Sequence, residues 1–311
     1  EGGFDTRWLG SRLSLDLTYY SKITKDALVG AVIPPDLGTL NTTQRTNLGS
    51  VKNAGLEGLL SAQLVDRRNF GLDMTLSASS NANKLLTLGV DAQGRPLPPQ
   101  VGSTTRNQPG YPLFGYWQRR YTYADANNDG MITVNEITVA DSASFIAYSA
   151  PRFESSLQAG VEFFEHKLRI SGLFDHKGGY SLLNGTERIR CQSRNNCFGT
   201  YSKDAPLWMQ ARAVAVRESS GNTQFGFMEN ATFTRFRELT ATVSLPQRLA
   251  AKAGARDASI ILSARNLHKW TKYSGIDPES DSDAGSTIST QTDFQAAPPP
   301  TYFIFRLNVT F

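Results

Sequence analysis

The last eleven residues of the chain, 301–311, alternate between apolar and polar side chains without interruption. One set of alternate positions carries Phe303, Phe305, Leu307, Val309 and Phe311. The other set carries Arg306, Asn308 and Thr310. Because the side chains of a β-strand point alternately to opposite sides, this segment predicts a strand with one apolar and one polar face. A second protein layer would cover the apolar face in a water-soluble sandwich, whereas lipid would cover it in an outer-membrane barrel. The segment alone leaves both architectures open.

The same alternation recurs along the chain and predicts seven further strands. They are expected within residues 12–20, 56–64, 70–78, 157–163, 168–174, 239–245 and 260–264. Residues 1–5 are a candidate for the end of a ninth strand. In each segment the apolar side chains share one face, so every predicted strand needs the same kind of cover as the last one.

The connections between these predicted strands alternate strictly between short and long. Those after Val65, Phe164 and Leu245 have roughly 4, 3 and 12 residues. The long connections fall near 21–45, 81–151, 176–227 and 268–299. Outer-membrane barrels have short periplasmic turns and long extracellular loops, whereas a sandwich has no reason to sort its loops. The chain is therefore predicted to be all-β, an antiparallel transmembrane barrel wall whose C-terminus lies in the periplasm.

Eight strands could close a narrow barrel, but these loops are too large for one. An open sheet in lipid would leave unpaired edges. We therefore expect the chain to be a fragment, a cleaved product or one chain completed by another.

Composition excludes several other classes of protein. Hydrophobic residues make up 40% of the chain, and no apolar run approaches the roughly 20 residues that a membrane-spanning helix needs. The net charge of +4 is spread along the chain without a basic cluster, so nucleic acid is not an expected partner. The three histidines, at 166, 176 and 268, lie far apart and near no recognisable nucleophile, so we do not expect an enzyme.

Aromatic residues near strand ends predict interfacial girdles: Tyr19, Tyr20, Phe163, Phe164, Trp270 and Tyr273.

Residues 125–136 fit the twelve-residue calcium loop of EF-hands at every defining position. The predicted ligands are Asp125, Asn127, Asp129, the Met131 carbonyl, Thr133 (often through water) and Glu136, which can bind bidentately. Gly130 permits the sharp turn between them. The alternative is a solvated acidic turn. Sensor EF-hands occur in pairs flanked by helices, but here there is one loop, and residues 116–123 before it read as extended. We therefore predict a structural Ca²⁺ that pins a long external loop.

Two other features belong to the predicted external loops. Cys191 and Cys197, the two cysteines of the chain, lie six residues apart in a polar stretch. Such a pair can close a small disulfide loop in an oxidising compartment, and the metal-site alternative lacks further clustered Cys or His. Residues 207–215 predict a short helix in an external loop.

Several segments together resemble the C-terminal part of the SusC/RagA family of TonB-linked outer-membrane transporters. They are residues 12–22, 47–57, the 125–136 loop, 236–239, 263–267, 272–279 and the terminal strand. The resemblance covers nearly the whole chain in order. The C-terminal Phe311 also resembles the signal that the bacterial barrel-assembly machinery reads.

The resemblance implies that residues 1–311 are part of a 22-stranded barrel, with 84–151 a long extracellular loop that contains the calcium segment. The plug domain and TonB box of the family are absent from this chain. Implied partners are outer-membrane lipid, the rest of the barrel and its plug, the TonB system and a SusD-like lipoprotein. The leading hypothesis is import of an oligosaccharide or peptide across the bacterial outer membrane. The alternatives are a structural or adhesive surface protein with calcium-stabilised loops and a soluble calcium-binding β-protein.

Overall fold

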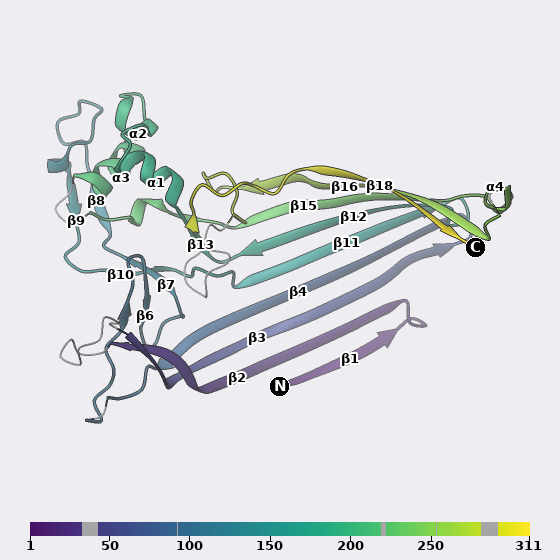
Figure 1. Cartoon of the computed structure of the whole chain (residues 1–311), viewed down its shortest axis with the longest axis horizontal. Coiled ribbons are helices and arrows are strands. Elements are labelled where there is room, and N and C mark those ends of the chain that lie inside the picture. Colours follow the sequence, from purple (N-terminus) through teal and green to yellow (C-terminus); the bar gives the residue numbers. More distant parts are fainter. Residues whose placement is uncertain (33–42, 92, 219–221, 253, 281–291) are drawn as a thin grey trace.

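A computed structural model describes residues 1–32, 43–91, 93–218, 222–252, 254–280 and 292–311. Its main element is a nine-stranded sheet in the order β1-β2-β3-β4-β11-β12-β15-β16-β18, with every neighbouring pair antiparallel (Figure 1). The strands are β1 (Gly2–Trp8), β2 (Leu13–Val32), β3 (Thr43–Arg67), β4 (Phe70–Thr87), β11 (Phe153–Phe163), β12 (Leu168–Gly178), β15 (Phe233–Ser244), β16 (Asp257–Thr271) and β18 (Tyr302–Thr310). The eight predicted strands are all present, and residues 2–5 begin the ninth, β1, which continues to Trp8 and does not end at residue 5.

Short and long connections lie at opposite ends of this sheet, as the sequence predicted. The turns β3–β4 and β11–β12 lie at the same end as the short helix α4 (Gln247–Lys252) and the C-terminus, and the long connections gather at the other end (Figure 1). The predicted long connection at 21–45 is wrong in extent, because β2 and β3 stay paired as far as Val32 and Thr43. Backbone pairing needs no apolar side chains, so the ladder continues beyond the point where the apolar alternation ends.

The strand register places the predicted apolar positions on one face. Neighbouring strands align a continuous row across the sheet: Leu15, Leu60, Leu76, Leu157 and Phe174. On the last strand, the side chains of this face are largely exposed: Phe303 has 78% and Phe305 has 67% of its full accessibility. No layer formed by the described residues covers this face along β18, which is the arrangement of a lipid-facing wall and not of a sandwich.

Aromatic rings bound this apolar face at both ends. Phe70 and Phe163 stack edge-on beside the short turns, and ten residues further along β4 and β11, Ser80 pairs with Phe153. Ten residues at about 3.3 Å each, tilted by about 40°, span about 25 Å, the height of the apolar band of an outer-membrane barrel. We call this band, from the level of Phe70 to that of Ser80, the apolar belt. Tyr19, Phe164 and Trp270 are exposed, as expected for girdle residues.

Two of the predicted girdle residues do not belong to the belt. Tyr20 follows Tyr19 on the strand, so its side chain lies on the opposite face, where its hydroxyl approaches Gly55. Tyr273 is 5% exposed and donates a hydrogen bond to Asp293. Proximity to a strand end was therefore an insufficient criterion, because it ignored which face the side chain occupies.

The opposite face of the sheet is polar and carries its own ion pairs. Arg169 lies 2.6 Å from the Asp73 carboxylate and 2.8 Å from that of Glu162, and Arg265 lies 2.6 Å from Glu238. An apolar outer face and a polar inner face are the two sides of a barrel wall.

The two edge strands of the sheet, β1 and β18, do not pair with each other in the described part of the chain. This agrees with the expectation that these strands do not close a barrel alone. Among the described residues, no helix is both long and apolar enough to cross a membrane.

The long connections fold into a second layer of structure, which we call the cap (Figure 1). Its strands are β5 (Gln100–Val101), β6 (Thr105–Asn107), β7 (Gly115–Gln118), β8 (Tyr121–Tyr123), β9 (Ile137–Val139), β10 (Ser144–Ala147), β13 (Ser181–Asn184), β14 (Met228–Asn230) and β17 (Thr292–Asp293). Its helices are α1 (Gly185–Gln192), α2 (Phe198–Tyr201), α3 (Leu207–Arg217) and the 3-10 turns η2 (Val134–Glu136) and η3 (Phe225–Phe227). The helix predicted at 207–215 is α3.

Candidate functional site

The cap has a hydrophobic core of its own. Its buried residues are Tyr116, Leu183, Cys191, Cys197, Ala213, Val216 and Phe227. They come from two long connections, β4–β11 and β12–β15, so segments far apart in the sequence share one core. A core shared in this way holds the cap together as a folded unit and not as separate loops.

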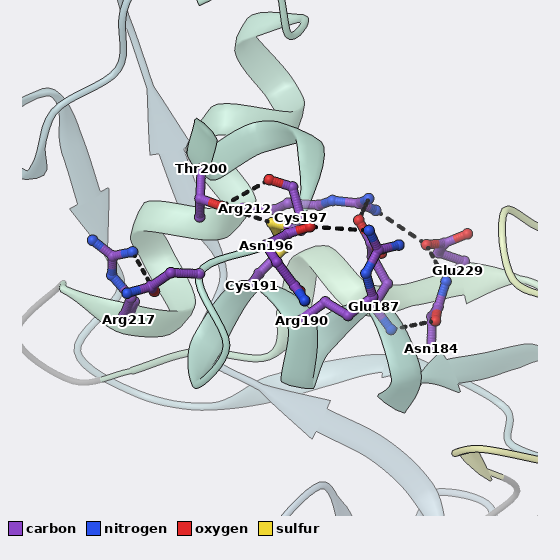
Figure 2. The surroundings of a disulfide bond; sticks show 11 residues. Asn184, Glu187, Arg190, Cys191, Asn196, Cys197, Thr200, Arg212, Arg217 and Glu229 are labelled. Atoms are coloured by element: carbon purple, nitrogen blue, oxygen red, sulfur yellow. Dashed lines mark hydrogen bonds and ion pairs between the residues drawn. A yellow bond between two sulfur atoms is a disulfide. The ribbon is translucent and has the colours of Figure 1, made fainter. Parts of the chain in front are cut away.

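Cys191 and Cys197 form a disulfide at the centre of this core (Figure 2). Both are fully buried, and their Cα atoms lie 4.9 Å apart. The bridge joins α1 to the residue before α2, and Asn184 caps the start of α1 by accepting a hydrogen bond from the Glu187 amide. The disulfide therefore holds the first two cap helices together.

A buried arginine lies beside the disulfide (Figure 2). Arg212 of α3 is 3% exposed and lies 3.1 Å from the Glu229 carboxylate and 3.3 Å from that of Glu187. Its guanidinium also stacks over the rings of Trp208 and Phe227. One positive charge between two carboxylates is well compensated, so this cluster ties α1, α3 and β14 together.

Loss of the disulfide should destabilise the cap and leave the sheet intact. For a closed loop of this length, the chain-entropy model gives about 2 kcal/mol. We expect the double variant Cys191→Ala, Cys197→Ala to show faster amide hydrogen exchange in α1, α2 and α3, and unchanged exchange in β11 and β12. Equal exchange in the cap of both proteins would show that the core holds without the bridge.

The predicted calcium segment forms a compact loop at the cap surface. Strands β8 and β9 frame it, pairing Tyr121 with Val139, where a sensor EF-hand has helices. Asp125 accepts hydrogen bonds from the Asp129 and Gly130 amides at 3.1 and 3.0 Å, and Gly130 has a φ of +74°. The loop therefore has a turn at Gly130 and directs the Asp125 carboxylate inward.

Glu136 closes the other side of the loop. Its carboxylate accepts hydrogen bonds from the amides of Thr133 and Ala126, both at 2.9 Å, and from the Thr133 hydroxyl at 3.0 Å. These bonds lower the pKa of Glu136, so the group is ionised at neutral pH. Asn127 and Asp129 contact each other, and Asp129 also accepts a hydrogen bond from the Met131 amide. An all-oxygen set with two carboxylates from the first turn and one from the last suits Ca²⁺.

The carboxylate oxygens of Asp125, Asp129 and Glu136 lie farther apart than the ligands of a bound metal ion would. In the part of the chain that the structure describes, the one cluster of three Asp, Glu, His or Cys groups within 4.8 Å of one another is Glu187 with Cys191 and Cys197. The two sulfurs of that cluster are bonded to each other and provide no thiolates. Ca²⁺ in the 125–136 loop would have to draw the carboxylates of Asp125, Asp129 and Glu136 closer together.

The side chain of Gln210 fastens this loop to α3. Its amide oxygen accepts a hydrogen bond from the Ile132 amide at 2.9 Å, and its amide nitrogen donates to the carbonyls of Gly130 at 3.1 Å and Ala205 at 2.8 Å. Gln210 is 5% exposed. A cavity of about 390 Å³ lies between this side of the loop and α2–α3. The loop is thus packed against the helical part of the cap. No sequence motif around Gln210 predicted this contact.

A second anchor ties the segment after β16 to the sheet. Arg235 donates two hydrogen bonds of 2.7 Å to Asp277, and both side chains are 4% exposed. Glu279 lies 2.9 Å from Arg235 and 2.7 Å from Arg237. Burial alone would raise the pKa of Asp277, but the hydrogen bonds from Arg235 and the Glu279 amide hold it below its usual range. We call this cluster the arginine anchor; Arg235 itself lies outside every segment singled out from the sequence.

Comparison with known proteins identifies the class of this chain. The β-barrel family described as "TonB dependent receptor-like, beta-barrel" matches residues 1–162, and the chain belongs to this family. Within it, the chain is SusC/RagA-like: it is 26% identical to TonB-dependent receptor P26 of Formosa agariphila over 96% of its length and 23% identical to the SusC receptor of Bacteroides thetaiotaomicron over 89%. These matches cover 33% and 29% of the two receptors, so the chain spans about a third of their length.

Solved structures agree with this class. The structure of the RagAB peptide transporter superposes with a TM-score of 0.77 over 99% of this chain and 34% of that one, at 20% identity. The open-open state of the RagAB peptide importer gives 0.71 at 21% identity. At this identity the likeness establishes the fold, the wall of a TonB-dependent receptor barrel.

Proposed function

We propose that this chain forms the C-terminal barrel wall and extracellular cap of a receptor that imports a large nutrient across the bacterial outer membrane by TonB-dependent transport. The observation that carries the proposal is the sheet itself, with an exposed apolar belt on one face, a polar inner face and a folded cap at one end. The family match supports the same reading. An oligosaccharide or a peptide is the substrate class, and the likeness to a RagAB peptide transporter favours the peptide.

The proposal assigns places to the parts of the chain. The cap, including the connection between β4 and β11 (the predicted 84–151 loop), is extracellular, and the short turns and Phe311 are periplasmic. A 22-stranded barrel, a plug, the TonB system and a SusD-like lipoprotein above the cap complete the transporter. Phe311 serves as the assembly signal. No step requires this chain to be an enzyme.

Import is tested in the organism that carries the full-length receptor. A strain lacking the receptor should lose growth on one class of large nutrient, peptides or oligosaccharides, and keep growth on the monomers of both. Complementation with the full-length gene should restore the loss. A strain that grows normally on every such nutrient but no longer attaches to surfaces would support the adhesive alternative instead.

The second part of the proposal is that residues 125–136 bind a structural Ca²⁺. Asp125, Asn127, Asp129, the Met131 carbonyl, Thr133 and Glu136 would hold the ion. Its role is to neutralise the carboxylates that converge in the loop and so stiffen the wall that Gln210 fastens to α3. Support comes from the complete motif and from the backbone amides that already orient Asp125 and Glu136 inward.

Removal of two ligands should abolish calcium binding without unfolding the receptor. The double variant Asp125→Ala, Glu136→Ala is expected to bind no Ca²⁺ in calorimetry and to exchange amide hydrogens faster over residues 124–136. Chelation should produce the same faster exchange in the unmodified protein. The control Asp141→Ala, Asp204→Ala removes two exposed carboxylates of the cap and should bind Ca²⁺ normally. If the loop is equally protected with and without calcium, the structural role is wrong.

A further inference from the structure

Two lysines lie directly opposite each other on neighbouring strands just beyond the apolar belt. Lys52 of β3 is the register partner of Lys84 of β4. The pairing is regular from Val51 to Ala62 on β3, so Lys52 shares a face with Leu56 and Leu60 of the belt. By the same alternation, Lys84 shares a face with Leu76 and Ser80. Both ammonium groups therefore lie on the lipid-facing side.

The immediate neighbours of the two lysines confirm this orientation. Val51 is 6% exposed and Leu85 is fully buried, because both lie on the opposite face under a cap segment that includes Leu97 and Leu113. The next residue on each strand must point the other way, away from the cap. Lys84 is exposed and Lys52 half-buried. The pair is thus on the outer side of the barrel wall, opposite the cap segment that covers Val51 and Leu85.

The height of the pair above the belt matches that of lipid headgroups. Lys84 lies four residues beyond Ser80, the upper limit of the belt. Four residues at about 3.3 Å each, tilted by about 40°, place it about 10 Å above the apolar belt on the cap side. The polar headgroup layer adds about 5–8 Å to each side of a hydrocarbon core of about 30 Å, so it ends at about this height, and long lysine side chains can reach down into it.

Neither lysine has a partner of opposite charge in the part of the chain that the structure describes. Within the described residues, neither takes part in an ion pair, a side-chain hydrogen bond or a ring contact. The nearest side chain across β2 on this face is Ile23, the register partner of Lys52. Like charges directly opposite each other on a sheet repel, so the pair is unfavourable unless an anion lies between them. An anionic group bound by both lysines would remove this repulsion.

We propose that Lys52 and Lys84 together bind the phosphate group of a lipid in the outer leaflet, with its acyl chains on the adjacent apolar belt. The inference rests on the proposed placement in the outer membrane. A lipid fits better than free phosphate, because the belt continues without a break below the lysines and can bury acyl chains beside Leu56 and Leu76. The bound lipid would fix the receptor's height in the membrane at the base of the cap.

The test uses the full-length receptor in detergent and measures lipid binding by native mass spectrometry. The probes are dimyristoyl phosphatidate and dimyristoyl glycerol, which share acyl chains and differ by the phosphate. At about 1 kcal/mol for each lysine near an anionic surface, the variant Lys52→Gln, Lys84→Gln should bind phosphatidate about thirtyfold more weakly. Binding of dimyristoyl glycerol should not change. The single variant Lys84→Glu, which can pair internally with Lys52, should lose phosphatidate binding while keeping the fold.

A matched control removes two lysines elsewhere. Lys22 lies on the inner face and Lys252 at the end of α4, so Lys22→Gln, Lys252→Gln should bind phosphatidate as the unmodified receptor does. An equal loss in the control, or no loss in the test variant, overturns the proposal. The proposal is also overturned if inorganic phosphate binds the lysine pair as tightly as phosphatidate does. If the unmodified receptor binds neither lipid, the lipid proposal is also wrong. The import proposal is tested separately by the growth experiment, so the two can fail independently.

Discussion

Replacing Arg235 with methionine should release the segment after β16 from the sheet. The substitution leaves the carboxylates of Asp277 and Glu279 without their buried guanidinium, and breaking one partner of a buried pair costs about 3–5 kcal/mol. We expect amide exchange over residues 273–280 to accelerate by two orders of magnitude or more (about 1.4 kcal/mol per factor of ten). Hydrogen exchange with mass spectrometry measures this directly.

Two comparisons sharpen the experiment. Arg265→Met removes a more exposed pair with Glu238, so its cost should stay within about 1 kcal/mol. Adding Asp277→Asn to Arg235→Met should recover part of the protection, since it removes one of the stranded charges. If Arg235→Met and Arg265→Met prove equally mild, the anchor is not what holds this segment.

Replacing Gln210 with leucine should detach the calcium loop from α3. The change leaves the Ile132 amide and the Gly130 and Ala205 carbonyls without their hydrogen-bond partner. Each buried group left unsatisfied costs about 1–3 kcal/mol. Water can reach the loop side once it opens, so we expect a net cost of about 3 kcal/mol. Exchange should rise in residues 124–136 and at the start of α3, and calcium affinity should fall because the loop is no longer held in shape.

Gln224→Leu provides the matched control, because the side chain of Gln224 is only half-buried and takes part in no hydrogen bond of the described structure. Its exchange and calcium affinity should equal those of the unmodified protein. An unchanged calcium affinity in Gln210→Leu would mean that the loop folds around its ion without help from the helix.

The wall of the barrel could be predicted from the sequence because its rule is local. Alternation at Leu13, Leu15 and Leu17 identifies a strand face without knowledge of its partners, and the loop lengths order the strands. The ends of β2 and β3 could not be predicted in this way. Beyond the belt no lipid selects apolar side chains, so the strands continue by backbone pairing, which leaves no hydrophobic signature.

The cap follows the opposite logic. The calcium motif could be predicted because its proposed ligands lie within twelve consecutive residues, and the disulfide could be predicted because of the spacing of the two cysteines. The roles of Gln210 and Arg235 could not, since each gains its role from residues about 80 and 40 positions away in the sequence. A glutamine in a helix and an arginine in a strand are ordinary residues until the fold brings their partners to them.

The unequal length of the strands has a consequence for what meets the cell surface. β3 extends from Arg67, at the level of Phe70, through Leu56 to Thr43. The thirteen residues beyond Leu56 rise about 33 Å above the apolar belt at the same tilt. The β2–β3 side of the wall therefore extends well above the headgroup layer around it. If this end faces the cell exterior, as we propose, a large solute would first meet protein on this side, and an antibody or phage could reach the tips of β2 and β3 without touching the membrane.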